Sequence, residues 1–312
     1  NTAVGYYALL ALTTGTRNTA VGTFAAYGTS DNNDNTAVGY IALGSGNLTG
    51  TRNVAVGSFA LDAQTTADDN TAVGHNALGA CTDGHINTAV GSGAGDAITT
   101  GQSSALVGCN AGGSITTGDF NVAVGEGALV GCTTGDNNIC IGHDSGRGNS
   151  PSGNITTGDN NVVLGNNSIQ NLYCADTSIS SSDSRDKADV TDFTKGLDWI
   201  KALRPVTYRW DRRTWYGTGV EGESDEFYGT PDGSKKRTRL HVGFLAQEAL
   251  AVEKANGYGS SNDDSLVVNL TEDGMSYGMK YERLVPVLVN AIKELSAKND
   301  ALEARIAALE GS

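Results

Sequence analysis

A five-residue motif, Asn-Thr-Ala-Val-Gly with small variations, recurs through the N-terminal part of this 312-residue chain and constrains its fold more than any other feature. Successive copies start 17 residues apart, except for one step of 18 and a last step of 23. Such a period is typical of solenoids, in which each repeat forms one coil and stacks on its neighbours. The ten copies start at Asn1, Asn18, Asn35, Asn53, Asn70, Asn87, Ser104, Asn121, Asn138 and Asn161.

Each repeat is predicted to form one coil with a single short strand at the motif. Alternation along a strand places the motif valine on one face and the alanine before it on the other. The motif glycine permits a turn with positive φ, and the asparagine that starts each repeat could form a ladder from coil to coil. At a strand spacing of ~4.8 Å, ten coils would make a rod of roughly 50 Å.

The coil itself is thin, because 17 residues enclose little apolar volume. The small alanines on one face indicate close approach of that face to something else. We therefore expect the solenoid to associate with copies of itself, and threefold association would provide the neighbours.

The residue after the motif glycine differs from copy to copy, which indicates that it faces solvent. His75 and His143 occupy this position and are expected to be surface histidines, with a metal on a trimer axis as the alternative. Threonine columns also occur in ice-binding solenoids, but the motif threonine is replaced by valine in three copies. We expect no metal site and no cofactor. The cysteines lack zinc or redox spacing and are expected to be free thiols: Cys81, Cys109, Cys132, Cys140 and Cys174.

The composition changes sharply near residue 180. No lysine precedes Lys187 and all three tryptophans follow it, whereas most of the 42 glycines lie before it. The formal net charge of −14 argues against a nucleic-acid partner, and no apolar run is long enough to span a bilayer. The chain begins in mid-pattern, which suggests a fragment.

Four segments follow from these patterns. The solenoid covers residues 1–170, a polar linker 171–181, a folded domain 182–284 and a C-terminal helix 285–312. Within the folded domain, residues 196–203 form an amphipathic helical pattern, 204–210 alternate like a strand, 211–239 form a long polar loop and 241–248 lead into a second helix.

The repeats over about residues 1–170 resemble the head repeats of trimeric autotransporter adhesins and similar repeats of phage tail fibres. The resemblance implies a left-handed parallel β-roll in which three chains lie side by side. The period differs from that of the adhesin heads.

The order of landmarks after residue 181 resembles the C-terminal intramolecular chaperone of endosialidases, tailspikes and tail fibres. This resemblance implies an α+β domain that trimerises, guides folding of the preceding β-solenoid and commonly releases itself by autoproteolysis. The landmarks are Ser-Asp-x-Arg-x-Lys at 182–187, which includes Asp183 and Arg185, then Leu203 with Pro205 and Val206, then 243–248, which includes Gly243, Phe244, Gln247 and Glu248, and finally Tyr281.

The resemblance places the family's catalytic pair on Ser182 and Lys187. A serine hydroxyl becomes a nucleophile when a base accepts its proton, and a neutral lysine can be that base. Ser182 would attack the carbonyl carbon of Ser181, so the chain would be a single-turnover serine autoprotease acting only on itself. Asp186 departs from the apolar residue usual before the lysine, and its carboxylate would favour the charged ammonium.

The C-terminal helix carries a heptad pattern of apolar residues. Asn299 falls at an a-type position, where it would determine the register. In isolated coiled coils this pattern favours two strands, whereas the family resemblance implies three, and we expect three. The seam consists of Val285, Leu288, Ile292, Leu295, Asn299, Leu302, Ile306 and Leu309.

These observations predict a structural and adhesive fragment of a virion tail fibre that carries its own chaperone. We expect a homotrimer, assembled in the host cytoplasm, which in the virion binds a glycan or protein of the host surface without membrane insertion. One alternative is a bacterial trimeric surface adhesin, although the membrane barrel that ends such adhesins is missing from the sequence. Another is the non-catalytic part of a polysaccharide-degrading tailspike.

Overall fold

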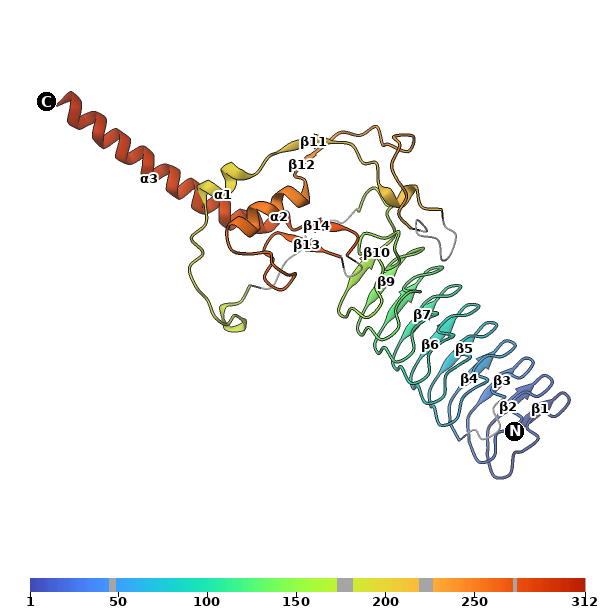
Figure 1. Ribbon diagram of the computed structural model, residues 1–312. Helices are drawn as coiled ribbons and strands as arrows, with labels where there is room; N and C mark the ends of the chain where they lie inside the picture. The colour runs from blue at the N-terminus through green and yellow to red at the C-terminus, as the bar shows by residue number, and fades with distance from the viewer. Residues whose placement is uncertain (45–48, 173–181, 219–226, 272–273, 312) are drawn as a thin grey trace. The chain divides into compact units, whose positions relative to one another are not determined.

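The computed structural model describes residues 1–44, 49–172, 182–218, 227–271 and 274–311 (Figure 1). The chain divides into two compact units. The first contains residues 1–170 together with 213–231, and the second contains residues 171–212 together with 232–312.

The first unit is a β-solenoid with one strand in each coil, as the repeats predict. Its ten strands form a single parallel sheet in sequence order, and each motif residue lies opposite the same motif residue of the next coil, as Ala20 lies opposite Ala37 (Figure 1). The strands are β1 (Thr2–Val4), β2 (Thr19–Val21), β3 (Thr36–Val38), β4 (Val54–Val56), β5 (Thr71–Val73), β6 (Thr88–Val90), β7 (Ala105–Val107), β8 (Val122–Val124), β9 (Ile139–Ile141) and β10 (Val162–Leu164).

The interior of each coil is filled by small and branched apolar side chains. The middle strand residue points inward, and Ala37 and Ala72 are fully buried. Leucines such as Leu61 and Leu78 pack beside these alanines from the opposite side of the coil. The alanine face, which the sequence suggests lies close to something else, lies against the opposite side of its own coil. The interior is narrow, and in β7 the middle residue is the buried Leu106 in place of an alanine.

The motif glycines are required for two reasons, which Gly57 illustrates. Its φ is +140°, in a region that residues with a side chain rarely adopt, as the sequence predicts. A Cβ on Gly57 would also lie 2.3 Å from the carbonyl oxygen of Gly74 in the next coil. The stacking distance between coils therefore excludes a side chain at this position.

A buried asparagine ladder connects successive coils, as the sequence suggests. The backbone N–H of Asn70 donates to Oδ1 of Asn53 at 2.9 Å, and the Asn70 Nδ2 donates to the carbonyl of Gly84 at 2.7 Å. The Oδ1 of Asn70 then accepts from the backbone N–H of Asn87 at 2.8 Å. Each asparagine thus satisfies backbone groups that the thin coil would otherwise leave buried without a partner.

The last, longer coil receives a segment that the sequence assigns to the following domain. Residues 213–231 group with the solenoid, and η2 (Arg213–Trp215) lies within them. Asn167 donates to Thr214 Oγ1 at 3.2 Å and accepts at its carbonyl from Trp215 Nε1 at 3.4 Å. The Arg147 guanidinium lies 5.1 Å from the centre of the Phe227 ring. Residues 213–231 thus contact both the longer coil, at Arg147, and the segment after β10, at Asn167.

The second unit has the mixed α and β character predicted for it. Its strands form two antiparallel pairs, β11 with β12 and β13 with β14. Its elements are η1 (Ser184–Asp186), α1 (Leu197–Ala202), β11 (Val206–Tyr208), β12 (His241–Gly243), α2 (Ala246–Ala255), β13 (Val268–Leu270), β14 (Tyr277–Met279), η3 (Tyr281–Arg283) and α3 (Leu284–Glu310).

The core of the second unit is small and aromatic. Trp199 on α1 is 2 % exposed, and its ring lies 6.1 Å from that of Phe193 and 6.3 Å from that of Tyr258. The first turns of α3 complete this core with Leu284 and Val287. Beyond these turns α3 is exposed along its length, so the helix has one packed end and one unpartnered end.

Candidate functional site

The sequence-predicted pair lies around a single turn of 3-10 helix. Ser182 precedes η1 and Lys187 follows it directly. Five residues in extended form would separate the two Cα atoms by about 17 Å. The turn instead brings Lys187 Nζ to 2.7 Å from Ser182 Oγ, a hydrogen-bond distance. The structure therefore brings together the two residues that the family resemblance selects.

The turn is held by an aspartate at its start. Asp183 accepts the backbone N–H of Arg185 at 2.9 Å and pairs with its guanidinium at 2.5 Å. The hydrogen bonds from Arg185 hold the pKa of the Asp183 carboxyl below its usual range, so the carboxylate stays charged at neutral pH. Both motif residues Asp183 and Arg185 thus contact each other and shape the turn between Ser182 and Lys187.

The Ser182–Lys187 pair is exposed to solvent in the single chain. Ser182, Asp186 and Lys187 are all exposed. Lys187 directs its ammonium to Ser182 and not to Asp186, although Asp186 is its neighbour in sequence. A lysine accepts a proton only in its neutral form, and water favours the ammonium. The geometry of a serine–lysine pair is present, whereas the desolvation that would activate the lysine is not. Ser181, which carries the carbonyl to be attacked, lies outside the described residues.

The second group of motif residues joins the end of β12 to η3, which directly precedes α3. The backbone N–H of Phe244 donates to Tyr281 Oη at 3.2 Å, and the two rings stack with centroids 6.1 Å apart. A Cβ at Gly243 would lie 2.6 Å from the same hydroxyl. Gly243 is therefore required because Tyr281 approaches the backbone, and both residues are structural.

The remaining motif residues lie on the surface of α2. Gln247 is exposed. Glu248 forms a double hydrogen bond with the guanidinium of Arg204, which connects α2 to the segment before β11. Asn299 is also exposed, and its Nδ2 donates to Glu303 of the same helix at 2.9 Å. None of these three residues contacts the Ser182–Lys187 pair.

Glu253 on α2 is a residue whose role the sequence does not reveal. It is fully buried, and its carboxylate accepts the backbone N–H groups of Leu266, Val267 at 3.0 Å and Val268 at 3.2 Å. A buried glutamate without these donors would be strongly unfavourable. A lone glutamate in an amphipathic helix looks like a surface residue, so no sequence pattern could have identified this contact.

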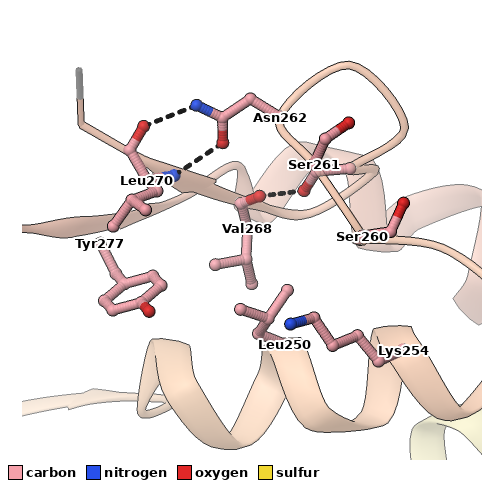
Figure 2. Close-up of a pocket in the computed structure, with 10 residues that line it drawn as sticks. Leu250, Lys254, Ser260, Ser261, Asn262, Val268, Leu270 and Tyr277 are labelled. Carbon is pink, nitrogen blue, oxygen red and sulfur yellow. Dashed lines mark hydrogen bonds between the residues drawn. The ribbon is translucent and has the colours of Figure 1, made fainter. Parts of the chain in front are cut away.

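A pocket of about 230 Å³ lies between α2, β13 and the loop that joins them (Figure 2). Its walls include Leu250, Lys254 and Tyr277, while Asn262 closes the loop by hydrogen bonds to both backbone groups of Leu270. None of the sequence-predicted site residues lines it. Within the described part of the chain, no cluster of three potential metal ligands occurs.

The cysteines have no pairing in the described ranges. Cys81, Cys109, Cys132 and Cys140 are free thiols, and Cys174 lies outside those ranges. Burial in the solenoid raises the pKa of Cys81 to about 11, so this thiol is unreactive at neutral pH.

Comparison with known proteins finds one family that matches part of the chain, mostly within the second unit. Residues 182–258 match the family described as chaperone of endosialidase. The match begins at Ser182 and includes the turn with Lys187, both strands of the β11–β12 pair and all of α2. Together with the β-solenoid, the match fits a tail-fibre-like protein with a C-terminal chaperone domain. No curated protein and no solved structure matches the chain.

None of the helices in the described ranges combines the length and apolar character of a membrane span.

Proposed function

We propose that this chain is part of a virion tail fibre whose C-terminal domain assembles three copies, directs folding of the β-solenoid and then cuts itself off between Ser181 and Ser182. The observation that carries the proposal is the 2.7 Å contact between Lys187 Nζ and Ser182 Oγ at the start of a chaperone-of-endosialidase domain. An intramolecular chaperone requires that the β-solenoid and the chaperone domain belong to the same chain, as they do here.

Support for self-association comes first from the outer face of the solenoid sheet. The third strand residue is apolar in all ten coils, and no strand contains a charged residue. Parallel sheets are normally covered on both faces, but here the outer face is open. In a chain with a net charge of −14, an uncharged face that carries an apolar residue in every coil is the surface on which copies can meet. Its most exposed members are Val4, Val21, Val90, Val107, Val124, Ile141 and Leu164.

Further support comes from α3. The heptad seam stays exposed beyond the turns that pack on the domain, with Ile292 at 67 % and Leu309 at 69 %. Asn299 lies among these residues, where a buried amide would determine the register of the partner helices. We propose a homotrimer along the whole chain, with the number three following from the chaperone family.

The proposed cleavage uses only groups of this chain and water. Neutral Lys187 accepts the proton of Ser182 Oγ, which attacks the carbonyl carbon of Ser181. The peptide bond to the Ser182 nitrogen breaks, that nitrogen takes up the proton and an ester forms. Water then hydrolyses the ester. Because Lys187 is exposed in the single chain, packing of further copies is needed to remove water, so cleavage follows assembly.

The fibre would be assembled in the host cytoplasm and act in the virion by attachment to a host-surface glycan or protein. Nucleic acid and membrane insertion have no part in this proposal. The acidic chain, in which lysine first occurs at Lys187, supports the exclusion of a nucleic-acid partner.

The direct test is the native mass of the purified chain together with a denaturing gel of the same sample. We expect three copies by light scattering and two bands in place of one at 32.1 kDa. A stable monomer at micromolar concentration would contradict the assembly proposal, whatever the gel shows.

Three variants separate the cleavage chemistry from assembly. Ser182→Ala and Lys187→Ala should leave the full-length band while the native mass stays that of a trimer. If the parent is uncut, Asp186→Leu should restore cutting, because it removes a carboxylate that favours the charged lysine. If the parent and Asp186→Leu both stay whole in the trimer, Ser182 is an ordinary linker residue.

A further inference from the structure

A row of aromatic rings runs along the first five coils of the solenoid, just after the strands. Neighbouring rings are in contact from coil to coil: Tyr6 with Phe24 at 5.8 Å, Tyr40 with Phe59 at 5.4 Å, and Phe59 with His75 at 6.0 Å between centroids. Most pairs meet edge to face. The aromatic row consists of Tyr6, Tyr7, Phe24, Tyr40, Phe59 and His75.

The row is not a requirement of the coil. The two repeat positions that form it hold an aromatic ring in every coil up to His75, whereas the next three coils hold none there and a single ring returns at His143. The residues after the motif glycine in those three coils are Ser92, Cys109 and Glu126. Those later coils have the same strand and the same turn. The unbroken row of rings therefore indicates a role that is specific to the first five coils.

Three rings of the row belong to residues with a left-handed backbone. Tyr7, Phe24 and Phe59 have φ between +58° and +60°, in the left-handed region. At the same turn position the later coils use Asn76 and Gly93, which adopt this region readily. Core leucines such as Leu43 and Leu61 adopt the same region, so the left-handed backbone belongs to the coil and the row is distinguished by its rings.

The exposure and charge of the row suit a neutral ligand. Tyr6 is 61 % and Tyr40 is 45 % exposed, so rings and hydroxyls both face solvent. The arginines of these coils are already paired, Arg17 with Asp34 and Arg52 with Asp69. No lysine occurs in these coils to bind an anionic polymer. Tyrosine presents an apolar ring and a polar tip together, which is what the face and hydroxyls of a sugar ring require.

Another copy of the chain is not the occupant that the row fits. Copies that associate along the whole shaft need the same contact in every coil, and the apolar third strand position supplies it from Val4 to Leu164. The aromatic row ends at His75, halfway along the solenoid. We propose that the aromatic row is a binding surface for a linear, uncharged glycan, whose successive sugar rings stack along it. The inference rests on the proposed attachment role and gives it a location and a ligand class.

The test is binding of the full chain to an array of linear oligosaccharides of glucose, mannose, galactose and N-acetylglucosamine, with oligomers of sialic acid as the charged counterpart. We expect saturable binding to a neutral oligosaccharide and none to the charged one. Two variants borrow residues that the repeats already use at these positions: Tyr40→Ser, as in Ser58, and Phe59→Asn, as in Asn76. Each should weaken binding on the order of tenfold, because one stacked ring is lost.

Phe120→Asn is the matched control. Phe120 is also exposed and left-handed, with φ +58°, but it lies at another turn position outside the row, where a later coil has Asn137. It should bind like the parent. Absence of binding to every neutral oligosaccharide, or equal binding by all variants, overturns the inference. Loss of the trimer in Phe59→Asn also overturns it, because the row would then be a contact between copies. Native mass and cleavage, read on the same samples, report separately on the proposed function.

Discussion

Both units of this chain have little core volume, and their cores are built in opposite ways. The solenoid repeats one small set of contacts from coil to coil, and most coils contain an inward alanine, a leucine, a glycine of the glycine column and an asparagine of the ladder. The chaperone unit has a core that occurs once, built around Trp199 and closed by the start of α3. A repeated core is insensitive to which coil meets which, whereas a unique core can assemble in only one way.

That difference explains why the units belong in one chain. In the proposed assembly, a solenoid that slips by one coil against a neighbouring copy would keep nearly all of its contacts, because every coil carries a closely similar strand. A unique domain with an exposed helical seam has one register, and it can start the stack at a defined coil. The changes below break or sharpen this comparison.

The largest effect is expected from removing the second unit altogether. Residues 1–176 expressed alone should aggregate, because nothing determines the starting register and the non-local search among equivalent coils is slow. Solubility and light scattering of this fragment, next to the full chain, provide the measurement. Soluble trimers formed by the fragment unaided would show that the solenoid needs no chaperone.

The next largest effect is expected from replacing one glycine in each unit by alanine. Gly57→Ala should destabilise the solenoid by about 3 kcal/mol, since the new Cβ meets the Gly74 carbonyl and the positive φ is strained. Gly233 in the chaperone unit also has positive φ, +86°, but nothing lies within 4 Å of its Cβ position. Gly233→Ala should therefore cost only about 1 kcal/mol. Denaturant titration followed by circular dichroism compares the two variants, and equal losses would mean that stacking distance does not matter.

A smaller effect is expected at the buried carboxylate. Glu253→Gln replaces one acceptor oxygen by an amide group that cannot accept from the backbone of β13, and it should destabilise the chaperone unit by about 2 kcal/mol. The control is Glu248→Gln on the same helix, whose pair with Arg204 is exposed to solvent, so its loss should lower the stability much less than the loss at Glu253. Tryptophan fluorescence during urea unfolding provides the measurement, and the signal combines Trp199 in the core with Trp210 and Trp215. Similar midpoints for both variants would contradict the role assigned to Glu253.

The smallest expected effect is an increase in the stability of the solenoid on substitution of Ser104. Ser104 interrupts the asparagine ladder. Its Oγ accepts from the Asn121 N–H at 3.2 Å, but serine has no amide to reach the turn that closes its own coil, as Asn87 reaches Gly101. Ser104→Asn should complete the ladder and stabilise the solenoid by about 1 kcal/mol. Because the chaperone unit has no equivalent repeat, the gain should appear only in the solenoid transition. A loss of stability here would mean that serine is needed for close packing in this coil.

The sequence by itself determined the repeated half of this protein almost completely. Ten copies of one motif predict the strands, their parallel order and the glycine turn, because in a solenoid each residue meets its own counterpart one coil away. In the chaperone unit the sequence predicts the helices and the β11 strand, and it selects Ser182 and Lys187 through family resemblance. The heptad pattern likewise predicts a long C-terminal helix, and α3 extends over Leu284–Glu310.

Only the tertiary structure decided which face of the strand is inside and which residues of the second unit are buried. Alternation says that Ala37 and Val38 lie on opposite faces, but the width of the coil selects the alanine for the interior. The buried role of Glu253 and the approach of Tyr281 to Gly243 join residues that are far apart in sequence, and no local pattern encodes them. The turn that brings Lys187 to Ser182 follows from the Asp183 cap, a contact whose geometry appears only once the backbone is in place.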